Sequence, residues 1–205
     1  DAIWVSMEMN PKWQEKRDNQ IDKIVGRSVR DVNFWLAEGD WEDMSRAQQR
    51  QFIQKYSDQN SESIGNTNEI PVVFINHPRQ SLYGIYEFER ANGGDLSVNT
   101  NSDEFTNFYN VIETTVHEGA GHGYQDFILE NKENYTRQNP EFKDQVDKFE
   151  LSYDQKTWPT SGSYYTELLD HYIYLQDASE KDAFYLGREA SSKINHNKPV
   201  GSSVR

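Results

Sequence analysis

Cysteine is absent from this chain of 205 residues, and that absence removes several classes of site. Without thiols there is no disulfide framework, no thiolate zinc site, no iron–sulfur cluster and no cysteine nucleophile. A protein-bound metal would therefore be held by imidazole and carboxylate groups, and the chain has only five histidines. These few histidines restrict where a metal site can lie.

Basic residues are also scarce: 21 Lys and Arg stand against 34 Asp and Glu, for a formal charge of −13. Because nucleic-acid binding depends on clustered Lys and Arg, we expect no nucleic-acid partner. No apolar run approaches the length of a membrane span, and no basic-then-apolar signal opens the chain. Because residue 1 is Asp, we expect a processed form or a piece of a larger chain.

The first 60 residues have a helical pattern. Apolar side chains recur at three- and four-residue spacing from Asn10 to about Tyr56, with a break expected at residues 37–40 and a second helix from Ser45. The polar run at residues 57–68 predicts a loop. We expect a helical region over residues 1–60 and a core over residues 69–205, together forming one compact domain.

The middle of the chain predicts a small sheet followed by a helix. Residues 69–76, 81–90 and 95–100 have strand composition, and the turn signal Ala91-Asn92-Gly93-Gly94 predicts that the last two form an antiparallel hairpin. Side-chain oxygens from Asn101 onward predict the start of a helix. The fold class expected is α+β, with N-terminal helices, a small mostly antiparallel sheet and C-terminal helices.

One segment stands out, His117-Glu118-Gly119-Ala120-Gly121-His122. Two imidazoles with a carboxylate beside the first are what a zinc hydrolase needs: neutral nitrogen ligands and a group that takes a proton from water. The spacing is unusual, because histidines five apart point about 140° away from each other on a regular α-helix. Histidines four apart, the commoner spacing, differ by about 40°.

The glycines of this segment leave two interpretations open. Gly119, Gly121 and Gly123 each cost on the order of 1 kcal/mol in a helix relative to Ala, so something must offset that cost. A π-bulge would widen the turn and return both histidines to one side, and such bulges favour functional sites. Alternatively, the helix ends at Gly119 and the histidines lie in a loop. We expect the bulge.

The motif resembles two groups of known metallopeptidases. HEGAGH is similar to the zinc motif of the dipeptidyl peptidase III family, gluzincin-like enzymes whose histidines are also five apart and whose third ligand is a downstream Glu. HEGAGHGYQ resembles, with one residue inserted, the HExxHAYQ signature of zincin-like domains in bacterial toxins and effectors, where an E-x-D-A-F segment carries the third ligand. Here that segment is Glu180-Lys181-Asp182-Ala183-Phe184.

The resemblance covers about residues 69–190 and implies a zinc-dependent peptidase. It implies Zn²⁺ held by His117, His122 and Glu180, with Glu118 as general base acting on a peptide or protein substrate. In zincins the strand before the motif helix binds the substrate backbone, which would assign that role to Leu96, Ser97, Val98 and Asn99. The likeness to toxin domains implies a secreted or exported bacterial protein.

Chemistry alone leaves the third ligand open. Glu167, Asp170 and Glu180 all compete, and Glu167 with His171 lies at a helical spacing that can also clasp a metal. Only the family pattern favours Glu180.

Other residues receive weaker assignments. Asp182 is expected to accept a hydrogen bond from a ligand imidazole, and Tyr165 or Tyr172 to stabilise the developing oxyanion. His77 and His196 are expected to be incidental.

Two other functions compete with a peptidase. The extra residue and the glycines also fit a zincin fold that has become a binding module with a structural or lost metal site. A hydrolase of non-peptide amides is a third candidate. No G-x-S-x-G elbow or G-x-x-x-x-G-K phosphate loop supports a serine hydrolase or a nucleotide-binding protein.

Overall fold

The structure, a computed structural model, describes residues 9–87, 94–154 and 177–199. The helices are α1 (Pro11–Ser28), α2 (Val32–Asp40), α3 (Arg46–Ile64), α4 (Phe108–Thr115), α5 (Gly123–Glu130), α6 (Lys132–Gln138), α7 (Lys143–Asp154) and α9 (Ala178–His196). A π-helix, η1 (Val116–His122), joins α4 to α5, and a 3₁₀ turn, η2 (Pro140–Phe142), precedes α7. The strands are β1 (Val72–Ile75), β2 (Gly84–Glu87) and β3 (Asp95–Asn99). The combination of helices and one small sheet confirms the α+β class.

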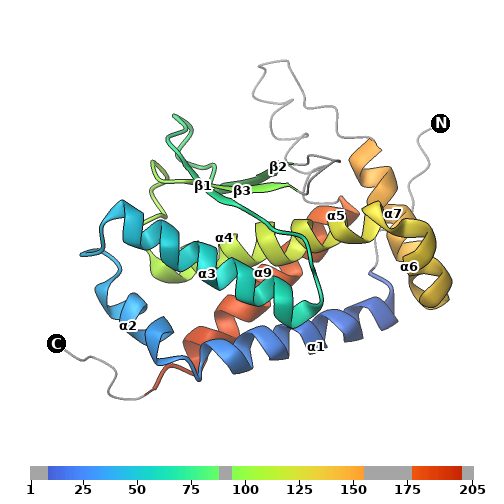
Figure 1. Ribbon diagram of the computed structural model, residues 1–205, viewed down its shortest axis with the longest axis horizontal. Coiled ribbons are helices and arrows are strands. Elements are labelled where there is room, and N and C mark those ends of the chain that lie inside the picture. The colour runs from blue at the N-terminus through green and yellow to red at the C-terminus, as the bar shows by residue number, and fades with distance from the viewer. Residues whose placement is uncertain (1–8, 88–93, 155–176, 200–205) are drawn as a thin grey trace.

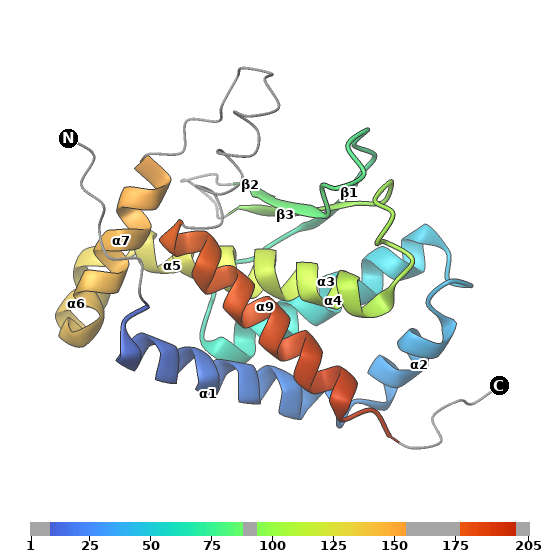
Figure 2. The same cartoon turned by 180° about the vertical axis from the view of Figure 1, so that it is seen from behind.

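The helices lie on one side of the sheet. In Figure 1 the continuous rod formed by α4, η1 and α5 runs beneath the strands, with α3 beside it and α1 farther from the sheet. Seen from behind in Figure 2, α9 crosses obliquely between α1 and this rod. The rod is thus enclosed by the sheet, α3 and α9, and its middle, η1, lies at the centre of the molecule.

The first helix begins where the sequence predicts. Asn10 accepts hydrogen bonds from the backbone N–H groups of Lys12 and Trp13, and Pro11 occupies the first turn. The break expected at residues 37–40 is wrong, because these residues belong to α2. The chain breaks earlier, where Asp31 caps α2 by accepting from the N–H of Asn33.

Residues 57–64 of the polar segment are helical, which corrects most of the predicted loop, whereas residues 65–68 lie outside helices and strands as expected. Helix α3 continues to Ile64 and ends at Gly65, whose φ of 82° terminates the helix in the left-handed conformation. Ser57, Asn60 and Ser61 are buried, so their polarity does not indicate solvent exposure. Tertiary packing has overridden a composition typical of loops.

The sheet has the order β1-β3-β2, with β1 parallel and β2 antiparallel to β3. The predicted antiparallel pairing of the last two strands is confirmed, whereas the expected mostly antiparallel sheet is in fact mixed. Because β3 is hydrogen-bonded on both edges, Leu96, Ser97, Val98 and Asn99 cannot also pair with a substrate backbone. All four are buried, so their assignment as a substrate strand is wrong.

Asn99 has a structural role. Its side-chain N–H groups donate to the carbonyl oxygens of His77, Arg79 and Leu82, and its side-chain oxygen accepts from the N–H of His77. It therefore holds the turn before β2.

The helix expected to begin at Asn101 begins later. Asn107 caps α4 by accepting from the N–H groups of Tyr109 and Asn110, and residues 100–106 form turns in which Phe105 is buried. The predicted capping pattern therefore lies in the turn before the helix.

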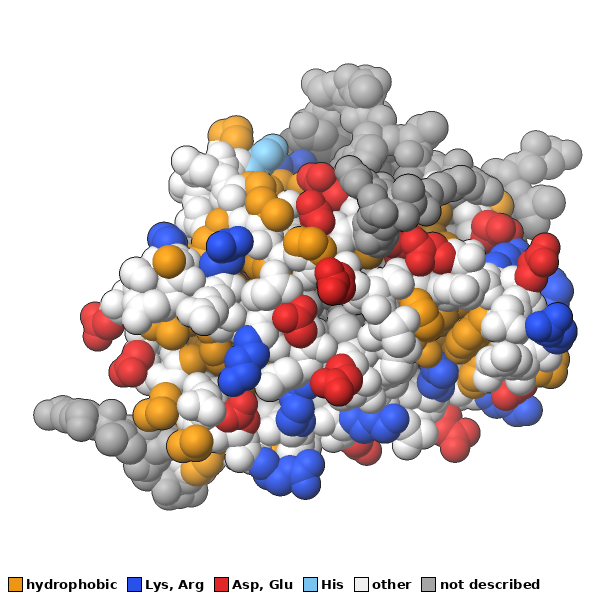
Figure 3. All heavy atoms as spheres, viewed as in Figure 1, with side chains coloured by type: hydrophobic (Ala, Val, Ile, Leu, Met, Phe, Trp, Pro, Cys, Tyr) orange, Lys and Arg blue, Asp and Glu red, His pale blue; other side chains and the backbone are white. Residues whose placement is uncertain are grey.

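Charge is unevenly spread on the face seen in Figure 3. Lys and Arg side chains gather along the edge formed by α1, while Asp and Glu side chains are scattered across the face between α1 and the sheet. Hydrophobic side chains lie exposed near α2, where Val32 and Leu36 project into solvent. Among the described residues, no helix is both long and apolar enough to span a membrane.

Candidate metal centre

The two motif histidines lie on one side of a π-helix. In η1 the backbone N–H of Gly123 donates to the carbonyl of Glu118, five residues earlier, as the π-helical pattern requires. With about 4.4 residues per turn, histidines five apart differ by about 50° rather than 140°. The imidazole centroids of His117 and His122 are 4.9 Å apart. The expected helix distortion is confirmed, and it extends over seven residues.

The glycines of the motif lie where neighbouring elements come close. A Cβ at Gly121 would lie 2.7 Å from the Cβ of Ala183 in α9, and a Cβ at Gly119 would lie 2.9 Å from the Oγ of Ser57 in α3. Real Cβ atoms do not approach other atoms so closely, so larger residues would push α9 and α3 away. The glycines therefore permit close packing around η1, in addition to any easing of the helix distortion.

Helix α9 brings Glu180 to the histidines. Asp177 caps this helix by accepting from the N–H groups of Ser179 and Glu180, which places Glu180 in the first turn. The Oε2 of Glu180 lies 3.3 Å from the Nε2 of His122 and 3.5 Å from the Nε2 of His117. Sequence chemistry could not choose Glu180, and the structure brings it to the site.

The cluster has the donor set and dimensions of a metal site. One ligand atom from each of His117, His122 and Glu180 lies within 4.8 Å of the others, and all three residues are buried. Ligands about 2.0–2.1 Å from a tetrahedral zinc ion lie about 3.3–3.4 Å from one another, close to the two distances from Glu180. The residues therefore fit a metal, and the cluster could hold an ion.

Glu118 lies at the edge of this cluster. Its Oε1 is 3.8 Å from the Nε2 of His117, and the residue is 8% exposed. Its stem lies beneath β2, where a Cβ at Gly84 would come within 3.1 Å of the Cγ of Glu118. Glu118 thus lies between the sheet and the histidines, beside the three residues that could hold an ion.

Two residues that the sequence did not indicate contact His122 at its Nδ1, the ring nitrogen that faces away from Glu180. The Nδ1 of His122 lies 3.0 Å from the Oε1 of Gln125 and 3.1 Å from the hydroxyl of Tyr153 in α7. Burial raises the pKa of the Tyr153 phenol well above its ordinary value, and the nearby carboxylate of Glu180 raises it further. Gln125 is the last residue of the HEGAGHGYQ segment, so its position three residues after His122 could have identified it. No motif in the sequence near Tyr153 indicated that this residue contacts His122.

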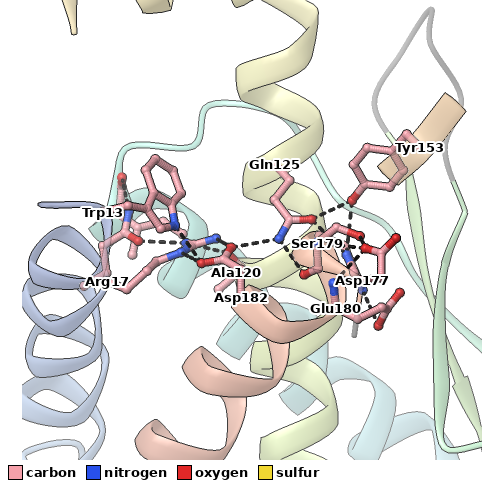
Figure 4. A network of polar contacts seen from close by, with 12 residues as sticks. Trp13, Arg17, Ala120, Gln125, Tyr153, Asp177, Ser179, Glu180 and Asp182 are labelled. Atoms are coloured by element: carbon pink, nitrogen blue, oxygen red, sulfur yellow. Dashed lines mark hydrogen bonds and ion pairs between the residues drawn. The ribbon is translucent and has the colours of Figure 1, made fainter. Parts of the chain in front are cut away.

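Asp182 does not contact an imidazole directly, which corrects its expected role. Its carboxylate accepts from the indole N–H of Trp13 at 2.7 Å, from Arg17, and from the side-chain N–H of Gln125 at 2.8 Å. Gln125 occupies the position next to His122 that Asp182 was expected to occupy. Figure 4 shows Gln125 between the Arg17–Asp182 pair on one side and Tyr153 on the other.

The remaining candidates separate into two groups. His77 lies exposed in the turn after β1 and His196 lies exposed at the end of α9, both away from the cluster. Tyr165, Tyr172, Glu167, Asp170 and His171 fall outside the described residues.

The chain matches no family model, no curated protein and no solved structure. The function must therefore be argued from this site itself.

Proposed function

We propose that the protein is a zinc-dependent peptidase. The observation that carries the proposal is the convergence of two imidazole Nε2 atoms and one carboxylate oxygen, with Glu118 beside them. Two histidines and a glutamate form a donor set known from catalytic zinc sites, in which three protein ligands leave a position for water or substrate. Imidazole nitrogens favour zinc over magnesium or calcium, which prefer oxygen ligands.

The residues divide into holding and proton-transferring groups. His117, His122 and Glu180 would hold the ion, which when bound polarises a carbonyl group and lowers the pKa of water. Glu118 would accept a proton from the attacking water and deliver it to the leaving amine. Its position 3.8 Å from the Nε2 of His117 keeps the carboxylate close to the reacting atoms.

A substrate backbone would lie along β2 rather than β3. Of the two edge strands in the described sheet, β1 and β2, β2 is the one beside Glu118, because a Cβ at Gly84 would lie 3.1 Å from the Cγ of Glu118. An extended peptide that pairs with this edge would place its backbone near the general base. Because Gly84 has no side chain, β2 packs closely on Thr114 and Glu118, and a Cβ there would lie 2.6 Å from the Cγ2 of Thr114.

Replacement of Glu118 tests the catalytic assignment. We expect Glu118→Gln to retain zinc but to lose at least about 10²-fold in peptidase activity, because the amide cannot accept the proton. Zinc content measured by atomic absorption, and cleavage of a random peptide mixture followed by mass spectrometry, would check this. Glu133→Gln, a change at an exposed position of α6, is the matched control. Full activity in a zinc-loaded Glu118→Gln protein would refute the assignment.

The burial of the cluster favours a second candidate, a structural metal site in a binding module. His117, His122 and Glu180 are 5%, 4% and 2% exposed, so solvent and substrate have little access to them, whereas a catalytic zinc ion keeps one position for water or substrate. Chelation of the metal discriminates: a structural site would lose much of its folding stability, whereas a catalytic site would lose activity with a smaller change in melting temperature.

A further inference from the structure

A chain of buried hydrogen bonds leads from the N-terminal helix to His122. It begins at Arg17 in α1 and passes through Asp182 in α9 to Gln125 in α5 (Figure 4). From the Oε1 of Gln125 it reaches the Nδ1 of His122. Arg17, Asp182 and Gln125 are all 0% exposed. Bulk solvent therefore does not reach these side chains, and the donors and acceptors that face one another along the hydrogen-bond chain must match.

The direction of the chain is set at its buried ion pair. The Nε of Arg17 donates to Asp182 at 2.9 Å, and its Nη2 forms a short ion pair with the other carboxylate oxygen. A guanidinium group has only donors and does not lose its charge in proteins, so Asp182 is held as the acceptor. The indole N–H of Trp13 can only donate as well, and it gives the carboxylate of Asp182 a further hydrogen bond to accept.

The acceptors next to Gln125 decide which way its amide faces. Its Nε2 lies 2.8 Å from the Oδ2 of Asp182 and 2.9 Å from the carbonyl oxygen of Ser179, and neither oxygen can donate. The reversed amide would aim an oxygen at two acceptors. The NH₂ group must therefore face Asp182, which turns the Oε1 of Gln125 toward His122 and Tyr153.

An amide oxygen accepts only, so the nitrogen of His122 that faces it must carry a hydrogen. Tyr153 donates its hydroxyl hydrogen to the same Oε1 at 2.6 Å, which leaves the phenolic oxygen as an acceptor for His122. Both neighbours of the Nδ1 therefore favour an Nδ1–H group. The lone pair of the imidazole is then on Nε2, the nitrogen that faces Glu180.

We propose that the chain Arg17–Asp182–Gln125, together with Tyr153, is a positioning device that fixes the hydrogen of His122 on Nδ1 and presents its Nε2 to a metal. This inference rests on the proposed metal site but concerns residues that contact no ion. It makes α1 part of the metal centre, since Arg17, the donor that sets the direction of these hydrogen bonds, belongs to that helix.

His117 provides an internal comparison. Its Nδ1 is buried and has no hydrogen-bond partner among the described residues, and its ring packs against Phe184 with centroids 4.4 Å apart. Packing rather than hydrogen bonding orients this second ligand. Loss of the hydrogen-bond chain should therefore change the orientation of the His122 imidazole and leave that of His117 nearly unchanged.

The test uses the full-length protein, with Zn²⁺ as the probe. We expect Gln125→Met to weaken zinc binding about 10- to 100-fold, measured by competition with a chromophoric chelator, because the thioether accepts a hydrogen bond from the imidazole only weakly. Arg17→Met should also weaken binding although it does not touch His122. Gln49→Met replaces another buried glutamine, which bonds the carbonyl of Trp41, and should leave zinc affinity unchanged.

Nitrogen-15 NMR spectra of the imidazoles distinguish positioning of His122 from a merely structural role of Gln125, because a structural role would leave the hydrogen on the His122 ring where it is. In the zinc-loaded wild type, we expect a hydrogen on the Nδ1 of His122 and the metal shift on Nε2, and Gln125→Met should alter the His122 signals more than those of His117. A wild type whose His122 binds zinc through Nδ1, or a Gln125→Met protein with unchanged zinc affinity, would overturn the inference.

The metal-free protein separates this inference from the proposed function. If the wild type binds no zinc, the proposed function fails, yet the chain still requires a hydrogen on the Nδ1 of His122. A metal-free spectrum with Nδ1–H would support the chain on its own. A bare Nδ1 would overturn it. If Arg17→Met does not fold, Gln125→Met and Tyr153→Phe carry the comparison.

Discussion

Single glycines set how closely α9 approaches the histidine segment. The Gly121 position faces Ala183, and in α9 a Cβ at Gly187 would lie 3.1 Å from the Cβ of His117. Glu180 is one turn before Ala183, so the depth at which α9 packs decides whether its carboxylate reaches the histidines. Small residues at this helix contact thus control whether His117, His122 and Glu180 come together.

Replacement of Gly121 by Ala tests this close contact. The new methyl group would lie 2.7 Å from the Cβ and 2.9 Å from the Cα of Ala183, so α9 must shift. We expect a loss of about 1–3 kcal/mol in the free energy of unfolding, typical of overpacking, and weaker zinc binding. Urea denaturation and chelator competition would measure these effects.

Gly39→Ala is the control for that change. Gly39 is an exposed residue of α2, and a Cβ there would have no described atom within 4 Å apart from its chain neighbours and its own helix backbone. Ala should therefore stabilise the helix by up to about 1 kcal/mol. A Gly121→Ala protein with wild-type stability and zinc affinity would contradict the close packing of α9 on η1.

At the scale of elements, α1 is joined to the site by both packing and charge. Trp13, Ile21 and Ile24 are fully buried, and the ring of Trp13 packs edge-on against Phe142 and Phe149. The Arg17–Asp182 pair ties the same helix to α9. These contacts make α1 a wall of the core rather than a lid that could open without loss of structure.

Removal of residues 1–30 is expected to abolish cooperative folding. Burial of Ile21 and Ile24 contributes about 1.5–3 kcal/mol each, and loss of a buried Trp costs about 3–5 kcal/mol. That loss is comparable to the total stability of about 5–15 kcal/mol typical of natural proteins. It would also leave the carboxylate of Asp182 buried without its cation.

Circular dichroism during thermal unfolding would measure the effect of this truncation. A synthetic peptide of residues 9–31, added in excess, should restore part of the transition, because it supplies the missing wall. A truncated protein that melts cooperatively and binds zinc as tightly as wild type would show that α1 is dispensable.

At the scale of the whole molecule, the site brings together elements far apart in sequence. Glu180 is 58 residues from His122, and Arg17 is 165 residues from Asp182. A metal that binds this assembly, and not the unfolded chain, must stabilise the whole fold.

Added zinc is therefore expected to raise the melting temperature. At a free zinc concentration about 1,000 times the Kd, linkage adds about 4 kcal/mol, or roughly 8–16 °C for a chain of this size. Differential scanning calorimetry would measure this, with His122→Ala as the variant that should lose the shift. Mg²⁺ is a control that should have little effect, because it prefers oxygen ligands. An equal shift in wild type and His122→Ala would place the bound metal elsewhere.

Several features could be predicted because their causes are local. The cap at Asn10 and the pairing of β2 with β3 each depend on residues close in sequence. The need for a distorted helix follows from the five-residue spacing of His117 and His122, since an undistorted helix would point them apart. By contrast, Ser57–Ile64 has a loop-like composition but is helical, because Ser57, Asn60 and Ser61 form a face that is buried against other elements.

By itself, the sequence determined the kind of side chain that could bind a metal and the first two candidate ligands, His117 and His122. The absence of cysteine restricts a metal site to imidazole and carboxylate, and the spacing of the two histidines requires a widened helical turn. Only the tertiary structure decided that Glu180 joins them, that Gln125 rather than Asp182 contacts His122, and that β3 lies inside the sheet. The physical reason is that local spacing fixes directions along one helix, whereas these three outcomes depend on how closely separate elements pack.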